Sequence, residues 1–246
     1  MRIRLQYPGF IIDYHTGEQL KTSNYTSALP PVLSLPFSTE GDQSFLYVVD
    51  SRHFSLIPDE FYDPNYHKDY LVQLGMSSDC PTGVSYIPSW KGYLVYSQEN
   101  IPPGEELNCT IHSVWEGLFE YAYNVLTDDG QLGLFVHITP NQIYLIGGDP
   151  EKLQFFNSFN VRDPLDCLYF ILQAIDRIKV GTIKIPVWLS GQFAEDSPLY
   201  RLLEQYIVHL AKAPGVVMPL KGLESTPPHQ YGDLSSFAAC VSSAAN

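Results

Sequence analysis

Apolar and polar residues alternate over short stretches in the first half of the chain, which predicts β-strands separated by turns. Residues 2–6 and 10–14 flank Tyr7-Pro8-Gly9, a composition typical of a tight turn. The same pattern predicts further strands at residues 19–25, 45–50, 53–57, 84–87 and 93–97. We expect strand 53–57 to pair with strand 45–50 across Ser51-Arg52.

Helical spacing of apolar residues appears between these strands. Pro58 to Phe61 opens one short helical segment, and Asp63-Pro64 opens a second that runs to about residue 74. Residues 112–126 have apolar side chains on one helical face, and Asp128-Asp129-Gly130 ends that helix, with glycine as the expected cap. This end also marks the expected boundary between two halves of the chain.

The pattern of the second half of the chain predicts three strands, a helix, a fourth strand and a second helix. The strands are expected at residues 132–138, 142–147, 152–159 and 185–190. Asp163 and Pro164 begin the first helix, and Ser197 and Pro198 begin the second, which runs to about residue 211. The first helix shows one continuous apolar stripe: Leu165, Leu168, Tyr169, Leu172, Ile175 and Ile178. A last strand at 216–220 and a helix of small residues at 235–245 complete the prediction.

The first half repeats this order of elements approximately. Each half begins with a strand, a turn containing proline (Pro8 or Pro140) and a second strand. The order β-β-β-α-β-α therefore predicts an α/β protein with an internal duplication of about 110–120 residues. We place the two lobes at residues 1–129 and 130–246.

The charge balance narrows the class of partner. Lys and Arg number 14 against 27 Asp and Glu, a formal net charge of −13. An acidic surface repels phosphate backbones and anionic lipids, so we expect no nucleic-acid partner.

No apolar stretch reaches the roughly 20 residues that a membrane span needs. The alternating N-terminus does not have the continuous apolar segment of a secretion signal. The four cysteines are scattered, which fits free thiols in a reducing compartment, and we expect a cytoplasmic location.

Several segments together resemble a known family. These are residues 54–62, 136–138 and 153–159, then Asp166-Cys167-Leu168-Tyr169-Phe170 and Leu189-Ser190-Gly191. They resemble an uncharacterised bacterial domain family of unknown function with an actin-like ATPase fold. The resemblance covers most of the chain. It implies two ribonuclease H-like lobes arranged as in actin-like ATPases, and it implies no reaction.

Active members of the actin-like fold bind phosphate and hydrated magnesium at two hairpin turns that contain Asp, with backbone N–H groups facing the phosphate. The corresponding turns here are Gln6-Tyr7-Pro8-Gly9 and Thr139-Pro140-Asn141, with no Asp and with a proline that removes one N–H donor. The adenosine-contacting turn corresponds to Ser190-Gly191, with one glycine where two are usual. We therefore expect no ATP hydrolysis, no cofactor and no bound metal.

Other candidate sites are weaker. Gly147-Gly148-Asp149-Pro150 is more typical of a β-turn than of a phosphate loop, because no helix start or Lys follows it. Cys109 and His112 are two ligand types at short spacing, whereas zinc needs about four. His137, in an apolar strand, is more typical of a hydrogen-bonded buried histidine than of a ligand. A metal-dependent nuclease using Asp13 or Asp50 would need a basic surface, which the composition does not provide.

The nuclease stays a third possibility, which metal binding near Asp13 or Asp50 would test, and two other functions fit the sequence better. The first is a non-catalytic actin-like module for interaction or assembly with a protein partner that the sequence does not identify. The alternative is a protein that binds a nucleotide or another small ligand in the cleft between the lobes. The candidate ligand-binding residues are Pro8, Gly9, Thr139, Asn141, Ser190 and Gly191.

Overall fold

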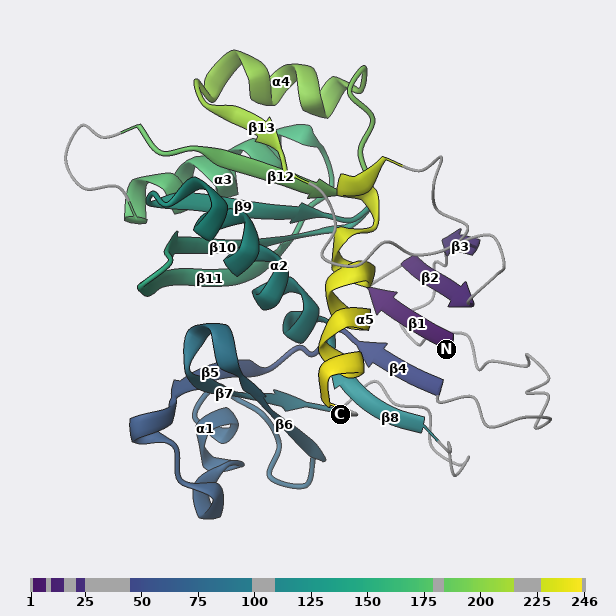
Figure 1. Cartoon of the computed structure of the whole chain (residues 1–246), viewed down its shortest axis with the longest axis vertical. Helices are drawn as coiled ribbons and strands as arrows, with labels where there is room; N and C mark the ends of the chain where they lie inside the picture. The colour runs from purple at the N-terminus through teal and green to yellow at the C-terminus, as the bar shows by residue number, and fades with distance from the viewer. Residues whose placement is uncertain are drawn as a thin grey trace. The chain divides into compact units, whose positions relative to one another are not determined.

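The computed structural model describes residues 2–7, 10–15, 21–24, 45–98, 109–178, 184–214 and 227–244. The chain divides into two compact units (Figure 1). The first unit consists of Met1–Glu116 with Leu220–Leu223, and the second of Gly117–Pro219 with Glu224–Asn246. No helix in the described ranges is both long enough and apolar enough to cross a membrane.

The main sheet of the first unit has the strand order β3-β2-β1-β4-β8. Its strands are β1 (Arg2–Tyr7), β2 (Phe10–His15), β3 (Lys21–Asn24), β4 (Phe45–Val49) and β8 (Cys109–Ser113). Strands β1, β2 and β3 form an antiparallel meander, and β1, β4 and β8 are parallel. The four predicted strands of this sheet are confirmed. Strand β8 was not predicted, and His112 lies in it because residues 109–113 pair with β4 before α2 (Val114–Asp129) begins.

A second, three-stranded sheet is inserted between β4 and β8, in the order β5-β7-β6. Its strands are β5 (Phe54–Pro58), β6 (Thr82–Ile87) and β7 (Gly92–Ser97). The predicted pairing of 53–57 with 45–50 is wrong, because β5 pairs along its whole length with β7. The predicted helix from Asp63 to residue 74 is divided into η2 (Pro64–Tyr66) and α1 (Asp69–Val72); η1 (Asp59–Phe61) and η3 (Pro88–Trp90) are single turns. Leu71 and Met76 cover Val95 of β7.

The main sheet of the second unit has the order β11-β10-β9-β12-β13. Its strands are β9 (Gly133–Ile138), β10 (Gln142–Asp149), β11 (Lys152–Asn160), β12 (Val187–Gly191) and β13 (Leu210–Lys212). Three antiparallel strands are followed by two parallel ones. This order and these directions are those of the main sheet in the first unit.

Helices cover both faces of this sheet. On β9, Leu134 and Val136 belong to the core cluster that includes Leu168 of α3 (Pro164–Ile178) and Leu203 of α4 (Pro198–Tyr206). The alternate residue Phe135 meets Tyr121 of α2 edge to face, with ring centroids 5.1 Å apart. Since successive strand residues point to opposite faces, α3 and α4 cover one face, while α2 and α5 (Gly232–Ala244) lie on the other.

Three predictions for the C-terminal part of the second unit have different outcomes. Helix α4 ends at Tyr206 and not near residue 211, because Leu210–Lys212 pair in parallel with β12. The predicted strand 216–220 lies outside the described residues. The predicted tail helix is confirmed as α5, and it is preceded by the turn η4 (Pro228–Gln230).

The apolar stripe predicted on α3 is divided between two environments. Cys167, Leu168, Ile171, Ala174 and Ile178 form the buried face of the helix. Leu165, Tyr169 and Leu172, which the sequence places in the same stripe, are exposed. The helix therefore has a buried apolar face and a second apolar stripe on its outer side.

Candidate functional site

The candidate residues of the second unit gather at one edge of its sheet. Strands β9 and β12 are parallel neighbours, with Ser190 opposite His137 and Gly191 opposite Ile138. Their carboxyl ends therefore meet, and the turn after β9 lies beside the turn after β12. The structure thus brings Thr139 next to the Ser190-Gly191 pair. Pro8 and Gly9 lie outside the described residues.

Thr139 and Asn141 hold the turn between β9 and β10. The Thr139 hydroxyl and the Thr139 backbone N–H both donate to the carbonyl oxygen of Gln142, at 2.9 Å each. The Asn141 carbonyl accepts a hydrogen bond from the N–H of Val161 at 2.9 Å. Thr139 is buried, whereas Asn141 is exposed. The Thr139 hydroxyl is therefore used within the turn, and Pro140 and Asn141 are the exposed residues of this turn.

Ser190 lies beneath the segment that leads into α5. Its hydroxyl donates to the carbonyl oxygen of His229 at 3.0 Å and lies 3.1 Å from Nδ1 of His137. Two side-chain amides extend the contact: Gln192 Nε2 donates to the Gln230 carbonyl at 2.9 Å, and Gln230 Nε2 donates to the Phe193 carbonyl at 3.2 Å. Ser190 is fully buried. The protein's own residues 229 and 230 therefore cover the turn that corresponds to the adenosine-contacting turn of the actin-like fold.

Gly191 makes the tight bend after β12. Its φ is +98°, in the left-handed region that favours glycine, and a Cβ atom built there would lie 2.1 Å from the carbonyl oxygen of Ile138. The same carbonyl accepts a hydrogen bond from Gln192 N–H at 2.7 Å. Close approach of the two strand ends, and not an opening for a ligand, accounts for this glycine.

The side chains of Ser190, His137 and Asp233 form a row in space at this point, with His137 in the middle. Nε2 of His137 is 3.5 Å from Oδ2 of Asp233, in the first turn of α5, and Nδ1 faces Ser190. In a hydrolytic triad serine contacts Nε2 and aspartate contacts Nδ1, the reverse of this arrangement. All three side chains are almost completely buried. The prediction that His137 is a hydrogen-bonded buried histidine is confirmed, and the cluster links β9 and β12 to α5.

Burial dominates the electrostatics of this cluster. Desolvation lowers the pKa of His137, against a smaller opposing effect of the Asp233 charge, and desolvation likewise lowers the pKa of His229. A neutral imidazole carries one proton. With the proton on Nδ1, His137 donates to the Ser190 oxygen, and the serine hydroxyl keeps its hydrogen bond to the His229 carbonyl. With the proton on Nε2, His137 faces Asp233, and the serine hydroxyl donates either to Nδ1 or to the His229 carbonyl. Neither arrangement requires a bound ligand.

These lowered pKa values predict a pH dependence of stability. The unfolded chain takes up protons on His137 and His229 below about pH 6.5, whereas the folded chain resists them. The contribution of these two histidines to the free energy of unfolding is therefore fully present above about pH 6.5. Below that pH the free energy of unfolding falls, by about 1.4 kcal/mol per pH unit for each proton that is taken up only on unfolding. Urea unfolding at several pH values between 5 and 8 measures this slope.

His209, an exposed histidine of the same unit, provides the control. The variant His137→Gln should reduce the slope, and His209→Gln should leave it unchanged. Equal slopes in the wild type and in His137→Gln would contradict the assignment of this proton to His137.

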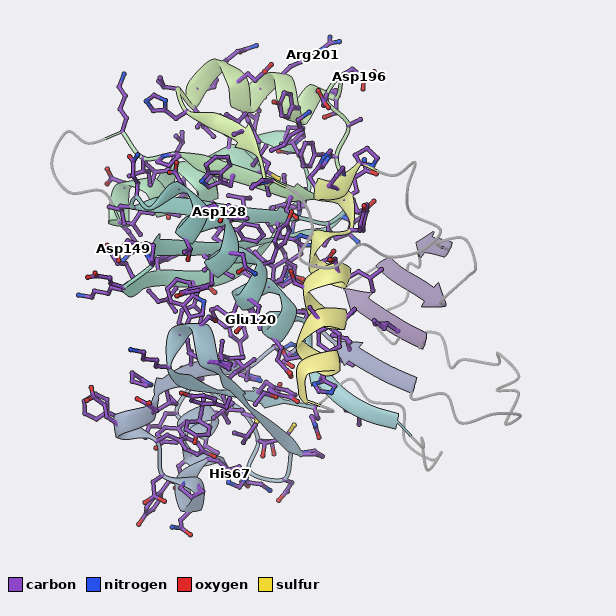
Figure 2. All side chains as sticks on the ribbon, in the orientation of Figure 1. His67, Glu120, Asp128, Asp149, Asp196 and Arg201 are labelled. Atoms are coloured by element: carbon purple, nitrogen blue, oxygen red, sulfur yellow. The ribbon has the colours of Figure 1, made fainter. Side chains whose placement is uncertain are left out.

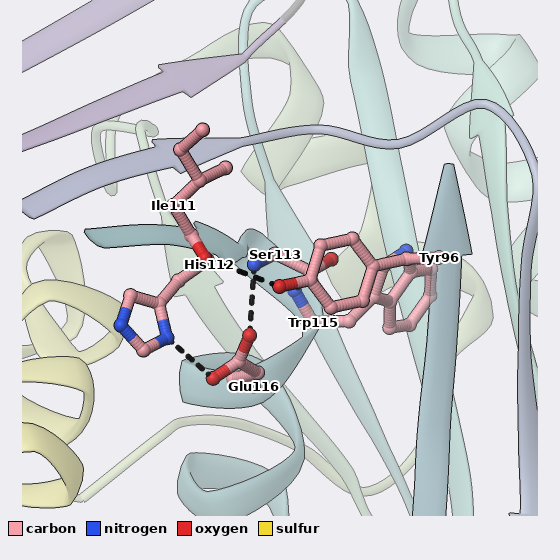
Figure 3. Close-up of polar contacts among 6 residues, drawn as sticks. All are labelled: Tyr96, Ile111, His112, Ser113, Trp115 and Glu116. Carbon is pink, nitrogen blue, oxygen red and sulfur yellow. Dashed lines mark hydrogen bonds and ion pairs between the residues drawn. The ribbon is translucent and has the colours of Figure 1, made fainter. Parts of the chain in front are cut away.

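A second polar cluster lies at the start of α2 in the first unit (Figure 3). The Glu116 carboxylate accepts from the Ser113 N–H at 2.9 Å and lies 2.8 Å from Nδ1 of His112. The Ser113 hydroxyl accepts from the Trp115 N–H at 3.3 Å, so Ser113 and Glu116 form a reciprocal cap. Tyr96 donates to the Ile111 carbonyl at 3.2 Å, and desolvation, reinforced by the Glu116 charge, raises the pKa of Tyr96. The cluster fixes the junction between β8 and α2.

Neither cluster forms a metal site. His112 has Glu116 as its carboxylate neighbour, and among the described residues no group of three or more His, Cys, Asp or Glu side chains is placed to hold a metal ion. Asp149, which ends β10 and is labelled in Figure 2, also has a structural role. Its Oδ1 accepts from the N–H groups of Glu151 and Lys152, at 2.9 Å each, in the turn between β10 and β11. A turn is confirmed at Asp149-Pro150, whereas Gly147 and Gly148 belong to β10, where the pairing with β11 shifts by one residue.

Sequence reasoning missed His229, Asp233 and Glu116 as members of these clusters. Glu116 had a usable signal, because Ser113 followed by Glu116 at the third position matches a capping box. His229 and Asp233 had none, since their partners lie 39 and 96 positions away along the chain (229 − 190 and 233 − 137).

Comparison with known proteins places the chain in a defined group. A family model described as "Protein of unknown function (DUF3822)" matches residues 43–210. A crystal structure from Bacteroides thetaiotaomicron, of a protein with an actin-like ATPase fold and unknown function, superposes with a TM-score of 0.72. The two chains are 11% identical, over 97% of this chain and 95% of that one.

A second similar structure is the PilM-PilN type IV pilus biogenesis complex, with a TM-score of 0.59 and 9% identity. The match covers 96% of this chain and 97% of that chain. No curated protein sequence matches. These matches confirm the predicted α/β class, the actin-like fold and the resemblance to a family of unknown function.

Proposed function

Because the chain belongs to this family of proteins of unknown function, we propose that it is a non-catalytic interaction or assembly module built on an actin-like fold. One observation carries the proposal. The Ser190-Gly191 turn, which corresponds to the adenosine-contacting turn of the fold's enzymes, is buried beneath His229 and Gln230. A nucleotide base would have to displace several hydrogen bonds that the protein makes with itself.

The hairpin turns support the same proposal. Thr139-Pro140-Asn141 has no Asp to hold hydrated magnesium, and the Thr139 hydroxyl is engaged with the Gln142 carbonyl. Phosphoryl transfer depends on magnesium and on charge stabilisation by positioned groups, which these residues do not supply. We therefore propose a pseudo-ATPase, in which the fold persists without the phosphate-binding residues.

An assembly role is also supported by analogy of fold. The PilM-PilN structure is a type IV pilus biogenesis complex, so a protein of similar fold is part of a complex with a protein partner. Such an analogy supports a kind of role and not a particular partner. The excess of acidic residues argues against nucleic acid as that partner.

We propose further that the two lobes, residues 1–129 and 130–246, arose by internal duplication. The support is the shared topology of the two main sheets, which have the same strand order and the same strand directions. Free thiols at Cys80 and Cys167 support a cytoplasmic location, because reducing conditions preserve them.

Nucleotide binding tests the main proposal. We expect calorimetry with ATP and magnesium to give no binding heat, and we expect no phosphate release. A ligand present at 100 times its dissociation constant would stabilise the fold by about 2.7 kcal/mol, which a thermal-shift assay would detect. Phosphate release would contradict the proposal. Binding without release would favour the alternative ligand-binding function.

The candidate residues provide the control for that alternative. Asn141→Ala changes an exposed side chain and keeps the backbone carbonyl that accepts from Val161. If a ligand binds at Pro8, Gly9, Thr139, Asn141, Ser190 and Gly191, this variant should weaken binding without loss of folding. If binding survives unchanged in Asn141→Ala, the ligand lies elsewhere.

A further inference from the structure

The outer side of α3 has an exposed apolar stripe. Leu165, Tyr169 and Leu172 are 65%, 55% and 38% exposed. They are spaced by four and three residues, so they lie on one side of the helix, one above the other. The opposite side, with Leu168 and Ile171, is buried in the core. Packing in the second unit therefore does not explain the apolar residues of this stripe.

The centre of the stripe is held in place. Gln173 Nε2 donates to the Tyr169 hydroxyl at 2.8 Å, along the helix. The Tyr169 ring meets Phe170 edge to face at 5.2 Å, and Phe170 stacks on Phe159 of β11 at 4.2 Å with an interplanar angle of 9°. An ordered aromatic side chain loses little conformational entropy on binding, which is favourable at the centre of an interface.

The charges at the two ends of the stripe are complementary to each other. Exposed Arg162 lies just before the helix, and exposed Asp176 lies near its end, each seven positions from Tyr169 (169 − 162 and 176 − 169). Two copies of α3 aligned antiparallel, with Tyr169 opposite Tyr169, place each Arg162 beside Asp176 of the other copy. Antiparallel helix dipoles favour the same direction.

We propose that this α3 stripe is a self-association surface whose occupant is a second copy of this chain, in a two-fold antiparallel pairing. A two-fold interface uses the same patch on both copies, so a residue at one end must suit the residue at the other. Arg162 and Asp176 meet that condition. A parallel pairing does not, because it sets Arg162 against Arg162. The inference rests on the proposed assembly role and names one partner for it.

Sedimentation of the full chain at increasing concentration, at fixed salt, tests the pairing. We expect a reversible monomer–dimer equilibrium. Arg162→Asp and Asp176→Arg, each alone, set like charges together at both ends of the pair and should weaken the dimer at least about tenfold. The double variant exchanges the charges and should restore the dimer. A Tyr206→Ser variant, which alters an exposed aromatic outside the stripe, should leave the equilibrium unchanged.

Cross-linking provides a second test that does not depend on the charges. The proposed two-fold axis passes Tyr169, so Tyr169→Cys should form a disulfide-linked dimer on mild oxidation, whereas the wild type and Tyr206→Cys should not. A wild-type chain that stays monomeric, or a double variant no better than the single ones, would overturn the pairing. Neither result would affect the proposal that the protein lacks ATPase activity. Conversely, ATP hydrolysis by a dimeric chain would overturn that proposal and leave the pairing of α3 unaffected.

Discussion

Replacement of Gly191 by alanine is expected to lower the free energy of unfolding by about 4 kcal/mol. Two effects add. An alanine at φ +98° adopts a strained backbone conformation, and its Cβ would lie 2.1 Å from the carbonyl oxygen of Ile138. That oxygen is backbone at the end of a central strand, so it cannot move aside as a flexible side chain could. The bend must shift, which also weakens the Gln192 N–H bond to Ile138.

Gly130 provides the matched control for this substitution. It belongs to the same unit and also has a positive φ, +65°, but no atom lies within 4 Å of its Cβ position. Gly130→Ala should therefore cost only the backbone strain, about 1 kcal/mol. Urea unfolding of both variants measures the difference. Equal losses in the two variants would show that β12 relaxes away from Ile138 and that the close approach contributes nothing.

Replacement of Phe237 by alanine is the second large expected effect, a loss of about 4 kcal/mol. Phe237 is 1% exposed on α5, and its Cβ lies 3.1 Å from the position where Gly117 of α2 would carry a side chain. The helices approach closely at this point, so truncation leaves a cavity that the backbone cannot close. Because α5 starts beside His229 and Asp233, we also expect faster proteolysis in the C-terminal segment.

Tyr206→Ala is the control for the loss of an aromatic ring. Tyr206 lies at the end of α4 in the same unit and is 59% exposed, so its removal should change stability by less than about 0.5 kcal/mol. Denaturant midpoints and proteolysis rates of the two variants should separate clearly. If Phe237→Ala unfolds like the wild type, α5 is not part of the cooperative core of this unit.

The elements of this protein were mostly predictable because local chemistry determines them. Asp163 accepts hydrogen bonds from the N–H groups of Leu165 and Asp166, as a capping residue before Pro164 should. The Gly130 N–H bonds back to Leu126 and Thr127 at the end of α2, as expected of a C-terminal glycine. These signals involve residues a few positions apart, so they can be read in order along the chain.

Errors arose where a distant partner decided the outcome. Strand β5 was expected to pair with its neighbour in sequence and pairs with β7 instead. Residues 210–212 continue a helical pattern, yet they form β13 because β12 offers a parallel edge. Helical spacing places Leu165, Tyr169 and Leu172 in one stripe with Leu168, although only Leu168 is buried. Helix α3 is apolar on two sides, and the helical spacing of apolar residues does not predict which side will face the core.

The same division applies to the candidate site. Local patterns along the chain are enough to predict the α/β class, the repeated order of elements and the proline-containing turns without Asp, and they identify Ser190-Gly191 as a turn of interest. The closure of this turn is visible only in the folded chain, because His229 and Gln230 reach it from nearly 40 positions away along the sequence. Hydrogen bonds and burial depend on which surfaces are in contact in the folded protein. Here the pairing of β9 with β12 and the position of α5 bring the turn and residues 229–230 together.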